Sequence, residues 1–349
     1  MNIRRKNINT VIAIFFLIIS AGCKKNEKHL DAVPAKQTSP QKLAVGFSID
    51  TLAIERWRRD CDIFMNTVKE NGLDVIVQNA GNSTEEQTRQ VQYLINRKVN
   101  AIVIVAKEAD KLSDTIKLAR SHGIPVISYD RLILNADISL YMTIDSEKVG
   151  ELMAGELYKA KPNGKWFCIY GPQADYNMTL IRTGLEKVLS GTNVNIAHIY
   201  YTDGWNYDLS YREMADLLSS GNIPDAVVCG NDAVANSVIQ AILEICPGKN
   251  IAVSGQDADI AGCQNVILGK QLCTIYKPIT KLSEDAAIAA CKLAEGKSVK
   301  ELVPDGQTIN NGFGDIPVIW LTPHIVTKEN MEEVVIKSGF HTKSEIYRY

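Results

Sequence analysis

The chain has no excess of either charge and no motif typical of nucleotide or metal chemistry. Its 38 Lys and Arg residues nearly balance 40 Asp and Glu residues, so the formal net charge is −2. The absence of a basic stripe argues against a nucleic-acid partner. The sequence also lacks a Gly-x-Gly-x-x-Gly element, a Walker loop, a Ser-His-Asp order and a metal-ligand cluster. We therefore expect no cofactor, no metal and no catalytic residue.

Paired cysteines are missing as well. The chain has eight cysteines, and none of them forms a Cys-x-x-Cys pair. Apart from Cys23, they are Cys61, Cys168, Cys229, Cys246, Cys263, Cys273 and Cys291. Several of these lie inside apolar runs, where a free cysteine behaves as a small buried hydrophobe. One reactive thiol is the alternative that an odd number leaves open in an exported protein.

The N-terminal apolar run is too short to span a bilayer. Val11–Ile19 has nine residues, follows a basic start and precedes small residues, which is typical of a signal peptide over residues 1–22. The ending Ala-Gly-Cys resembles a bacterial lipoprotein signal, which would make Cys23 the lipidated first residue and a membrane anchor. Ser20 departs from that pattern, so an ordinary secretory signal remains the alternative. Residues 23–42 are polar and contain two prolines, which predicts a flexible tether.

From Leu43 onward, short apolar runs alternate with helical patterns. Apolar residues at helical spacing predict a helix over Glu55–Glu70, and Ser83 with Glu86 has the capping-box pattern. Further strands are expected at Leu43–Ile49, Asp74–Gln78, Ala101–Ala106, Ile124–Tyr129, Tyr141–Ile144, Trp166–Tyr170, Ile196–Tyr201, Ala226–Gly230 and Ile251–Gly255. Further helices are expected at Lys111–Ser121, Met178–Ser190, Tyr211–Ser219, Ala233–Ile245 and Ile260–Lys270. This alternation predicts an α/β fold of parallel sheets flanked by helices, and its restart near Trp166 predicts two similar lobes.

Five of the apolar runs end abruptly in polar clusters. These clusters are Asp130-Arg131, Asp175 with Asn177, Asp203-Gly204-Trp205, Asn231-Asp232 and Gln256-Asp257-Ala258-Asp259. In an open parallel sheet, residues just past the carboxyl ends of the strands line the ligand crevice. Carboxylates, amides, an arginine and a tryptophan in that crevice suit a neutral ligand rich in hydroxyls. The pattern therefore predicts carbohydrate binding.

A set of collinear segments resembles one family over residues 43–349. The segments are Ile54–Trp57, Tyr129–Arg131, Glu147–Leu152, Asp203–Trp205, Asn231–Ala233, Ser254–Asp259, Tyr276–Thr280, Asn310–Gly312 and Val335–His341. They are similar to those of periplasmic sugar-binding proteins of the ribose/galactose/xylose type. The resemblance implies a type I periplasmic-binding-protein fold that closes on a monosaccharide, D-xylose foremost.

The resemblance also implies that both lobes are discontinuous. We expect residues 43–147 and 280–322 in the N-terminal lobe, and residues 148–279 and 323–349 in the C-terminal lobe. Three strands should cross between the lobes, near residues 147–149, 278–281 and 321–324. The protein would act outside the cytoplasm.

Two tryptophans are candidates for stacking on the apolar face of a sugar ring. Trp205 follows a glycine in a loop-like stretch, where a ligand contact is more natural than core packing. Trp57 fits the apolar stripe of its predicted helix, so core packing is its alternative. Arg56, beside it, has a solvated helix-face charge as its alternative.

Polar candidates follow the strand ends. Arg131 offers a fixed fork of donors to neighbouring oxygens, and Asp130 stands beside it; a structural ion pair is the alternative for both. Asn231 and Asp257 can exchange hydrogen bonds with hydroxyls, although each precedes a helix that it could cap. The two roles could also be divided, with Asp232 or Asp259 as the cap while Asn231 and Asp257 face the ligand. The remaining candidates are Asp175 and Asn177, for which capping is again the alternative, and Lys277 at the hinge.

Two other functions disagree with the sequence, and one question about the function stays open. A glycosidase would need an isolated carboxylate pair, which this mixed constellation lacks. A sugar-responsive repressor would carry an N-terminal helix-turn-helix where this chain has a signal sequence. The sequence does not decide which membrane protein interacts with the sugar-loaded chain. It could be an ABC permease, or the extracellular part of a sensor histidine kinase in a two-component system.

Overall fold

The computed structural model describes residues 42–348. The predicted signal peptide (1–22), the lipidation site Cys23 and nearly all of the predicted tether lie outside the described residues. The described residues belong to one compact unit by their contacts. In the part of the chain that is described, no helix has the length and apolarity needed to cross a membrane.

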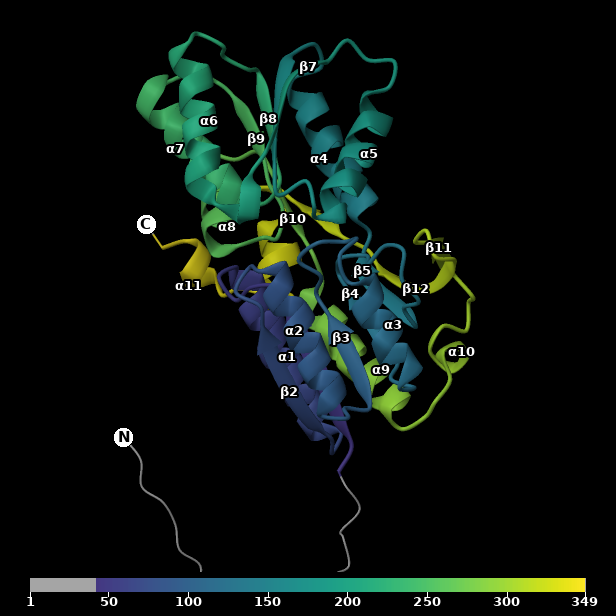
Figure 1. Cartoon of the computed structure of the whole chain (residues 1–349). Helices are drawn as coiled ribbons and strands as arrows, with labels where there is room; N and C mark the ends of the chain where they lie inside the picture. The colour runs from purple at the N-terminus through teal and green to yellow at the C-terminus, as the bar shows by residue number, and fades with distance from the viewer. Residues whose placement is uncertain (1–41, 349) are drawn as a thin grey trace, which may run out of the picture. The chain divides into compact units, whose positions relative to one another are not determined.

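One lobe, which we call the N-terminal lobe, is built on a seven-stranded sheet in the order β11-β12-β5-β4-β3-β1-β2. Its strands are β1 (Ala44–Ile49), β2 (Asp74–Asn79), β3 (Ala101–Ile104), β4 (Val126–Tyr129), β5 (Leu140–Ile144), β11 (Thr308–Asn310) and β12 (Asp315–Leu321). Neighbouring strands are parallel except β11 and β12. Helices α1 (Glu55–Glu70) and α9 (Ile279–Ala294) cover one face, and α2 (Thr84–Asn96) and α3 (Ser113–Ser121) cover the other. The short helix α10 (Val299–Leu302) follows α9 (Figure 1).

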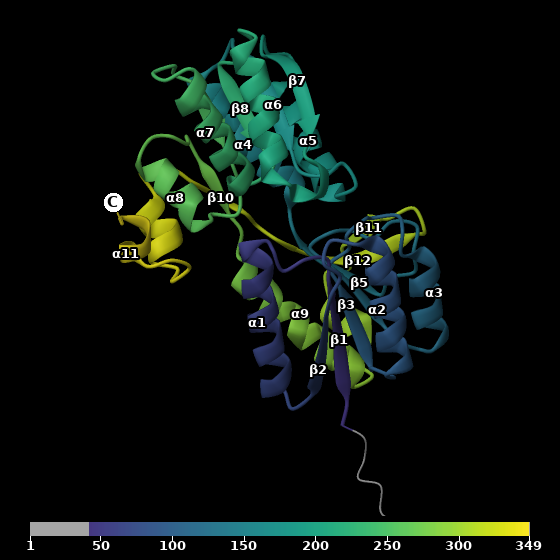
Figure 2. The ribbon, with the colours of Figure 1, turned by 60° about the vertical axis from the view of Figure 1, so that its left-hand side comes forward.

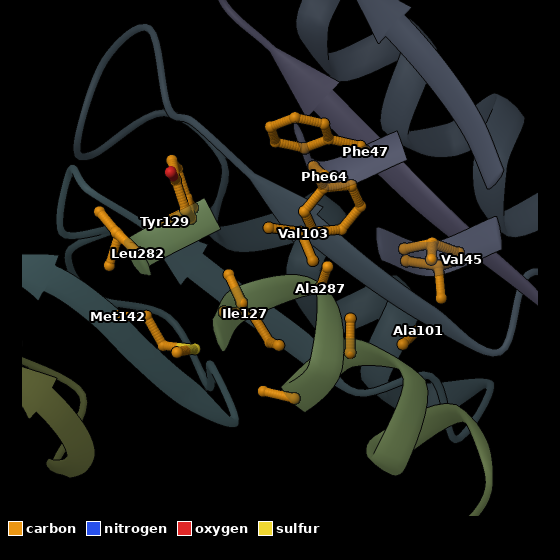
Figure 3. Packing of buried hydrophobic residues seen from close by; sticks show 14 of the residues in the cluster. Val45, Phe47, Phe64, Ala101, Val103, Ile127, Tyr129, Met142, Leu282 and Ala287 are labelled. Carbon is orange, nitrogen blue, oxygen red and sulfur yellow. The ribbon is translucent and has the colours of Figure 1, made fainter. Parts of the chain in front are cut away.

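The core of this lobe follows from the alternation of side chains along β1. Val45 and Phe47 face α1 and α9, and the rings of Phe47 and Phe64 lie 4.5 Å apart between centroids (Figure 3). Burying a side chain of this size stabilises a fold by roughly 1.5–3 kcal/mol. Gly46 faces the opposite side, where a Cβ atom would lie 2.9 Å from Leu94 Cδ1 of α2. The missing side chain lets α2 pack closely on the sheet.

The C-terminal lobe repeats the arrangement with a parallel sheet in the order β7-β6-β8-β9. Its strands are β6 (Lys165–Tyr170), β7 (Asn195–Tyr201), β8 (Ala226–Cys229) and β9 (Ala252–Ser254), and an antiparallel pair, β10 (Thr274–Tyr276) and β13 (His324–Val326), adjoins them through a bridge from Ser254 to Cys273. Helices α4 (Ser146–Ala160) and α5 (Tyr176–Leu189) cover one face, and α6 (Tyr207–Ser219) and α7 (Asp232–Ile245) cover the other. Helices α8 (Ile260–Ile267) and α11 (Lys343–Ile346) pack together beside β13.

Three connections join the lobes, as the two views show (Figures 1 and 2). The chain leaves β5 at Ile144 and enters α4 at Ser146, whose helix belongs to the core of the C-terminal lobe. It returns between β10 and α9 through Lys277 and Pro278. It crosses again between β12 and β13 through Thr322 and Pro323.

The predicted α/β class with helix-flanked parallel sheets is confirmed, and the predicted helix Glu55–Glu70 has the observed limits. The capping box at Ser83 is only half formed. Ser83 Oγ accepts from Glu86 N at 3.2 Å, but the Glu86 carboxylate bonds to Arg89 and Gln90 instead of returning to Ser83. Helix α6 begins at Tyr207 rather than Tyr211, because the Asn206 side chain caps it by accepting from Asp208 N.

Candidate functional site

A small cavity lies at the carboxyl ends of strands from both lobes. Together with the open space at its mouth, it takes in about 330 Å³ free of protein atoms. All ten predicted ligand residues line it: Arg56, Trp57, Asp130, Arg131, Asp175, Asn177, Trp205, Asn231, Asp257 and Lys277. Ile54, Met178 and Gln256, which were not predicted, complete the lining.

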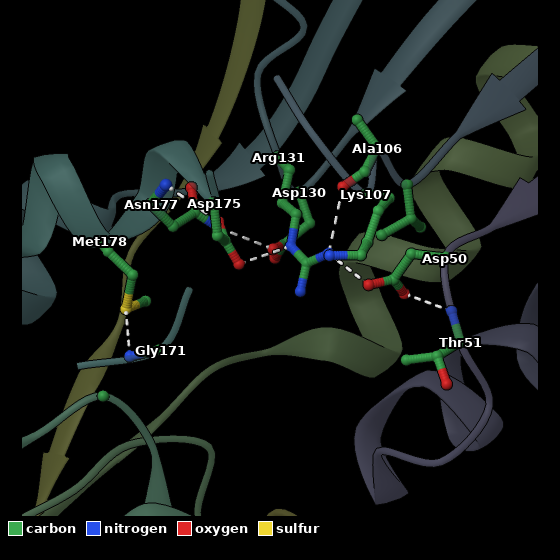
Figure 4. Close-up of polar contacts among 12 residues, drawn as sticks. Asp50, Thr51, Ala106, Lys107, Asp130, Arg131, Gly171, Asp175, Asn177 and Met178 are labelled. Carbon is green, nitrogen blue, oxygen red and sulfur yellow. Dashed lines mark hydrogen bonds and ion pairs between the residues drawn. The ribbon is translucent and has the colours of Figure 1, made fainter. Parts of the chain in front are cut away.

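Arg131, in the loop after β4, holds the centre of the polar network in Figure 4. Its Nη1 donates to Asp50 Oδ2 at the end of β1 and to the Ala106 carbonyl at 3.1 Å, and its Nε lies 2.7 Å from Asp175 Oδ2. Burial alone would lower the pKa of Arg131, but the charges of Asp175 and Asp50 more than offset it and raise the pKa. Because Asp175 belongs to the C-terminal lobe, this charged pair joins the two lobes.

Asp130 makes a second link between the lobes. Arg56 Nη2 donates to Asp130 Oδ2, and Asn177 Nδ2, on α5, donates to Asp130 Oδ1 at 2.9 Å. Burial acts to raise the pKa of Asp130, but the positive charges of Arg56 and Lys277 prevail and lower it. The carboxylate therefore stays ionised, and its remaining lone pairs can accept from a ligand.

Trp57 lies under two guanidinium groups in the first turn of α1. The Cζ atoms of Arg56 and Arg131 lie 4.4 Å and 5.3 Å from its ring centroid. Trp57 also belongs to the core of the N-terminal lobe, so the structural alternative considered for it holds beside its place in the cavity wall. Its Nε1 has no hydrogen-bond partner among the described residues.

Asp60, one turn further along α1, contacts the Arg56 side chain. Its Oδ2 lies 3.5 Å from Arg56 Nε and accepts from the Tyr129 hydroxyl at 2.8 Å. Burial raises the pKa of Asp60 to about 7, although Arg56 acts to lower it. The pair fixes the orientation of the Arg56 side chain that reaches Asp130.

Trp205 follows β7 and is part of the cavity wall that the C-terminal lobe contributes. It lies in the short 3-10 helix Asp203–Trp205. Its ring covers Gly171, where a Cβ atom would come within 2.3 Å of Trp205 Cη2. Any side chain at position 171 would therefore displace the ring. Trp205 Nε1 has no hydrogen-bond partner within residues 42–348.

The remaining wall combines Asp257, Lys277, Asn231 and Gln256. Lys277 Nζ lies 2.9 Å from Asp257 Oδ1. Gln256 Nε2 donates to the Gly230 carbonyl at 2.6 Å, and its Oε1 has no partner among the described residues.

The expected division between capping and binding is wrong for Asn231. Its own Oδ1 caps α7 by accepting from Val234 N at 2.9 Å, and its side chain also forms a hydrogen bond with Tyr207. Asp232 instead accepts from the side chains of Gln271 and Thr274. Asp175 likewise caps α5 by accepting from Asn177 N at 3.1 Å, in addition to pairing with Arg131.

Three cavity residues have left-handed backbone conformations. The φ angles are 62° at Asp130, 57° at Trp205 and 97° at Asp257. Such conformations cost about 1–3 kcal/mol each in residues other than glycine and cluster at functional sites. The backbone conformations that direct these three side chains into the cavity therefore lower the stability of the fold.

The charged side chains that line the cavity are paired with each other. Three cationic side chains, Arg56, Arg131 and Lys277, line it together with three carboxylates, Asp130, Asp175 and Asp257. Each cation already has a carboxylate partner, and Asp50 and Asp60 behind the wall add further contacts to Arg131 and Arg56. A charged ligand would therefore find no free counter-charge in the cavity, whereas a neutral polar ligand needs none. Among residues 42–348, no group of three or more His, Cys, Asp or Glu side chains is placed to hold a metal ion.

Comparisons with known proteins identify the family of the chain. The model of the periplasmic binding protein domain matches residues 45–298. The chain is 39% identical over 310 residues to the D-xylose-binding periplasmic protein of Haemophilus influenzae, covering 87% of this chain and 92% of that one. It is also 39% identical over 311 residues to the D-xylose-binding periplasmic protein of Escherichia coli, covering 88% of this chain and 93% of that one.

A solved structure shares the fold along nearly its whole length. It is an ABC transporter solute-binding protein from Clostridium phytofermentans with bound β-D-glucose, with a TM-score of 0.80 and 28% identity, covering 87% of this chain and 99% of that one. These relatives are binding proteins and not enzymes, as the sequence predicted. By the family model and by identity over most of its length, the chain belongs to the periplasmic binding proteins.

Proposed function

We propose that the chain binds one neutral monosaccharide, D-xylose foremost, between its two lobes and delivers it to an ABC permease. The pairing of every cationic side chain in the cavity wall with a carboxylate carries the proposal, because it leaves no free charge for a charged ligand and suits a polar ligand without charge. The two relatives that are 39% identical are named for D-xylose. Family membership places the chain outside the cytoplasm.

Unused hydrogen-bonding groups in the cavity match the chemistry of a sugar. Trp205 Nε1 can donate, and Asn177 Oδ1 and Gln256 Oε1 can accept, yet none has a partner among the described residues. A hydroxyl group both donates and accepts, so a polyol can satisfy such a mixed set. Buried polar groups that gain partners on binding favour the complex by about 0.5–1.5 kcal/mol each.

Calorimetry with a panel of sugars tests the proposal. We expect D-xylose to bind one to one, more tightly than ribose, arabinose, glucose or galactose. Glucuronate, which carries a carboxylate, should give no heat because no cation in the cavity wall is free to pair with it. Absence of heat with every neutral sugar would refute the proposal, whereas a preference for another neutral sugar would correct only the identity of the ligand.

Replacing Trp205 should weaken binding without unfolding the protein. Trp205→Ala removes an aromatic plate and should raise Kd about ten- to a hundredfold, as expected for burial worth 1.5–3 kcal/mol. Trp205→Phe retains an apolar ring and should lose less. The matched control is Trp320→Phe, since Trp320 packs against Tyr141 and is not among the residues that line the cavity. Equal affinities of Trp205→Ala and the control would exclude a role for the Trp205 ring.

The anchor remains a separate prediction, because Cys23 lies outside the described residues. If Cys23 carries lipid, Cys23→Ser should move the protein from the membrane fraction to the supernatant when cells are fractionated. Its affinity for the sugar should not change. The same distribution for both proteins would show that Cys23 does not anchor the chain, leaving an ordinary secretory signal.

Delivery to a permease is favoured over sensing by the solved relative, whose description names an ABC transporter. A sensor kinase ectodomain would use the same closure of the lobes. Purified permease in vesicles distinguishes the two clients. We expect the sugar-loaded protein to stimulate ATP hydrolysis by the permease; no stimulation would favour the sensor.

A further inference from the structure

A hydrogen bond at the rim of the cavity joins the two lobes outside the polar network described above. Asn82, between β2 and α2, donates from Nδ2 to the carbonyl oxygen of Gly204 at 3.2 Å. β2 and β7, which precede these two residues, are edge strands of their sheets. Neither strand leads into one of the three connections between the lobes. The contact therefore exists only when the lobes approach each other.

In the N-terminal lobe, Asn82 is hydrogen-bonded to Asp50, the residue that pairs with Arg131. Asn82 N donates to the Asp50 carbonyl at 2.7 Å, and the Asp50 carboxylate accepts from Arg131 Nη1. The φ angle of Asn82 is 68°, a left-handed conformation that asparagine tolerates better than most residues. This backbone conformation and the bond to Asp50 fix the place from which the side chain reaches across the rim.

On the side of the C-terminal lobe, the acceptor directly precedes Trp205. Gly204 and Trp205 both have left-handed φ angles, 56° and 57°. A Cβ atom at position 204 would lie 2.9 Å from Asn82 Nδ2, so glycine permits the close approach. The hydrogen bond thus holds the strained turn that places the Trp205 ring over the cavity.

We propose that Asn82 is a latch that holds Trp205 in place once the lobes have closed, and so sets how slowly the ligand leaves. The inference rests on the proposed binding of a neutral sugar. A contact made only in the closed form stabilises that form and not the open one. Its loss should therefore speed dissociation, while association, which begins in the open form, should stay the same.

Asn82→Gly tests the latch, because glycine accepts a left-handed φ angle without strain and removes the donor. The matched control is Asn135→Gly, since Asn135 is an exposed asparagine with a φ angle of 54° and is not among the residues that line the cavity. Stopped-flow tryptophan fluorescence with D-xylose, or with the neutral sugar that binds best, gives both rate constants. Asn82→Gly should dissociate about three- to tenfold faster, as expected for the loss of one neutral hydrogen bond.

The association rate constant and the melting temperature of the sugar-free protein should match those of the control. A dissociation rate equal to that of the control would refute the latch and leave the proposed function standing. Slower association with unchanged dissociation, or a lower melting temperature than the control, would also refute it, because these results indicate a structural role in the N-terminal lobe. A wild-type protein that binds no neutral sugar would refute the proposed function together with the latch.

Discussion

Asp257→Asn is expected to weaken sugar binding by about thirty- to a hundredfold, the effect of losing charge-assisted hydrogen bonds worth 2–3 kcal/mol. Asp257 lies in the cavity wall with its Oδ1 atom 2.9 Å from Lys277 Nζ. Its carboxylate can accept from hydroxyl groups that closure removes from water. Asparagine retains the size of the side chain and tolerates the φ angle of 97°, so the backbone should not change.

Calorimetry and melting curves measured together distinguish binding from folding. Asp305→Asn is the matched control, because Asp305 is exposed and is not among the residues that line the cavity. We expect Asp305→Asn to melt like the wild type and to bind normally. Asp257→Asn should lose affinity, and it should also melt at a lower temperature because it leaves Lys277 buried without its carboxylate partner. Equal affinities for the two variants would mean that Asp257 has a structural role beside Lys277 and does not bind the ligand.

Arg131→Met should have the largest effect on folding. Methionine fills part of the space, but it leaves Asp50 and Asp175 buried without their cationic partner. Removing one member of a buried ion pair typically lowers the free energy of unfolding by about 3–5 kcal/mol. Sugar binding should be lost as well, because the variant removes both a donor in the cavity and a link between the lobes.

Urea unfolding of Arg131→Met and Arg182→Met measures this cost against a surface pair. Arg182 pairs with Glu186 at 2.7 Å, but the two side chains are 42% and 52% exposed. Such pairs contribute about 0–1 kcal/mol, so the control should stay close to the wild type. A similar loss of stability in both variants would contradict the central place that Arg131 has in the network.

The positions of the predicted site residues follow from one rule about sheets. Residues just past the carboxyl ends of parallel strands meet at one edge, so Asp175 and Asn231 could be placed at one edge of the second sheet and Asp130 at the corresponding edge of the first. That these two edges face each other was implied by the resemblance to the family. The same rule would have found Asp50, which follows the first apolar run directly and holds Arg131. Gln256 stood in a cluster already singled out, and only its neighbour Asp257 was chosen.

The partnerships across the cavity could not be predicted in this way. Pairing of Arg131 with Asp175 depends on how the two lobes approach each other, which no local pattern encodes. From the sequence, Asn231 could either bind the ligand or cap a helix, because the sequence does not tell where its side-chain oxygen points. The structure shows that this oxygen caps α7. The left-handed backbone conformation of Trp205 could not be predicted from the sequence either, because residues other than glycine rarely adopt it.

A crystal structure of the protein grown with D-xylose tests the central claim most directly. We expect the sugar in the cavity between the lobes, with its hydroxyl groups about 3 Å from Arg131, Asp257 and Asn231, the distance of a normal hydrogen bond. The ring should lie against Trp205, with no water between them. A sugar bound elsewhere, for example in the surface hollow lined by Arg120 and Lys297, with the cavity free of sugar, would contradict the account.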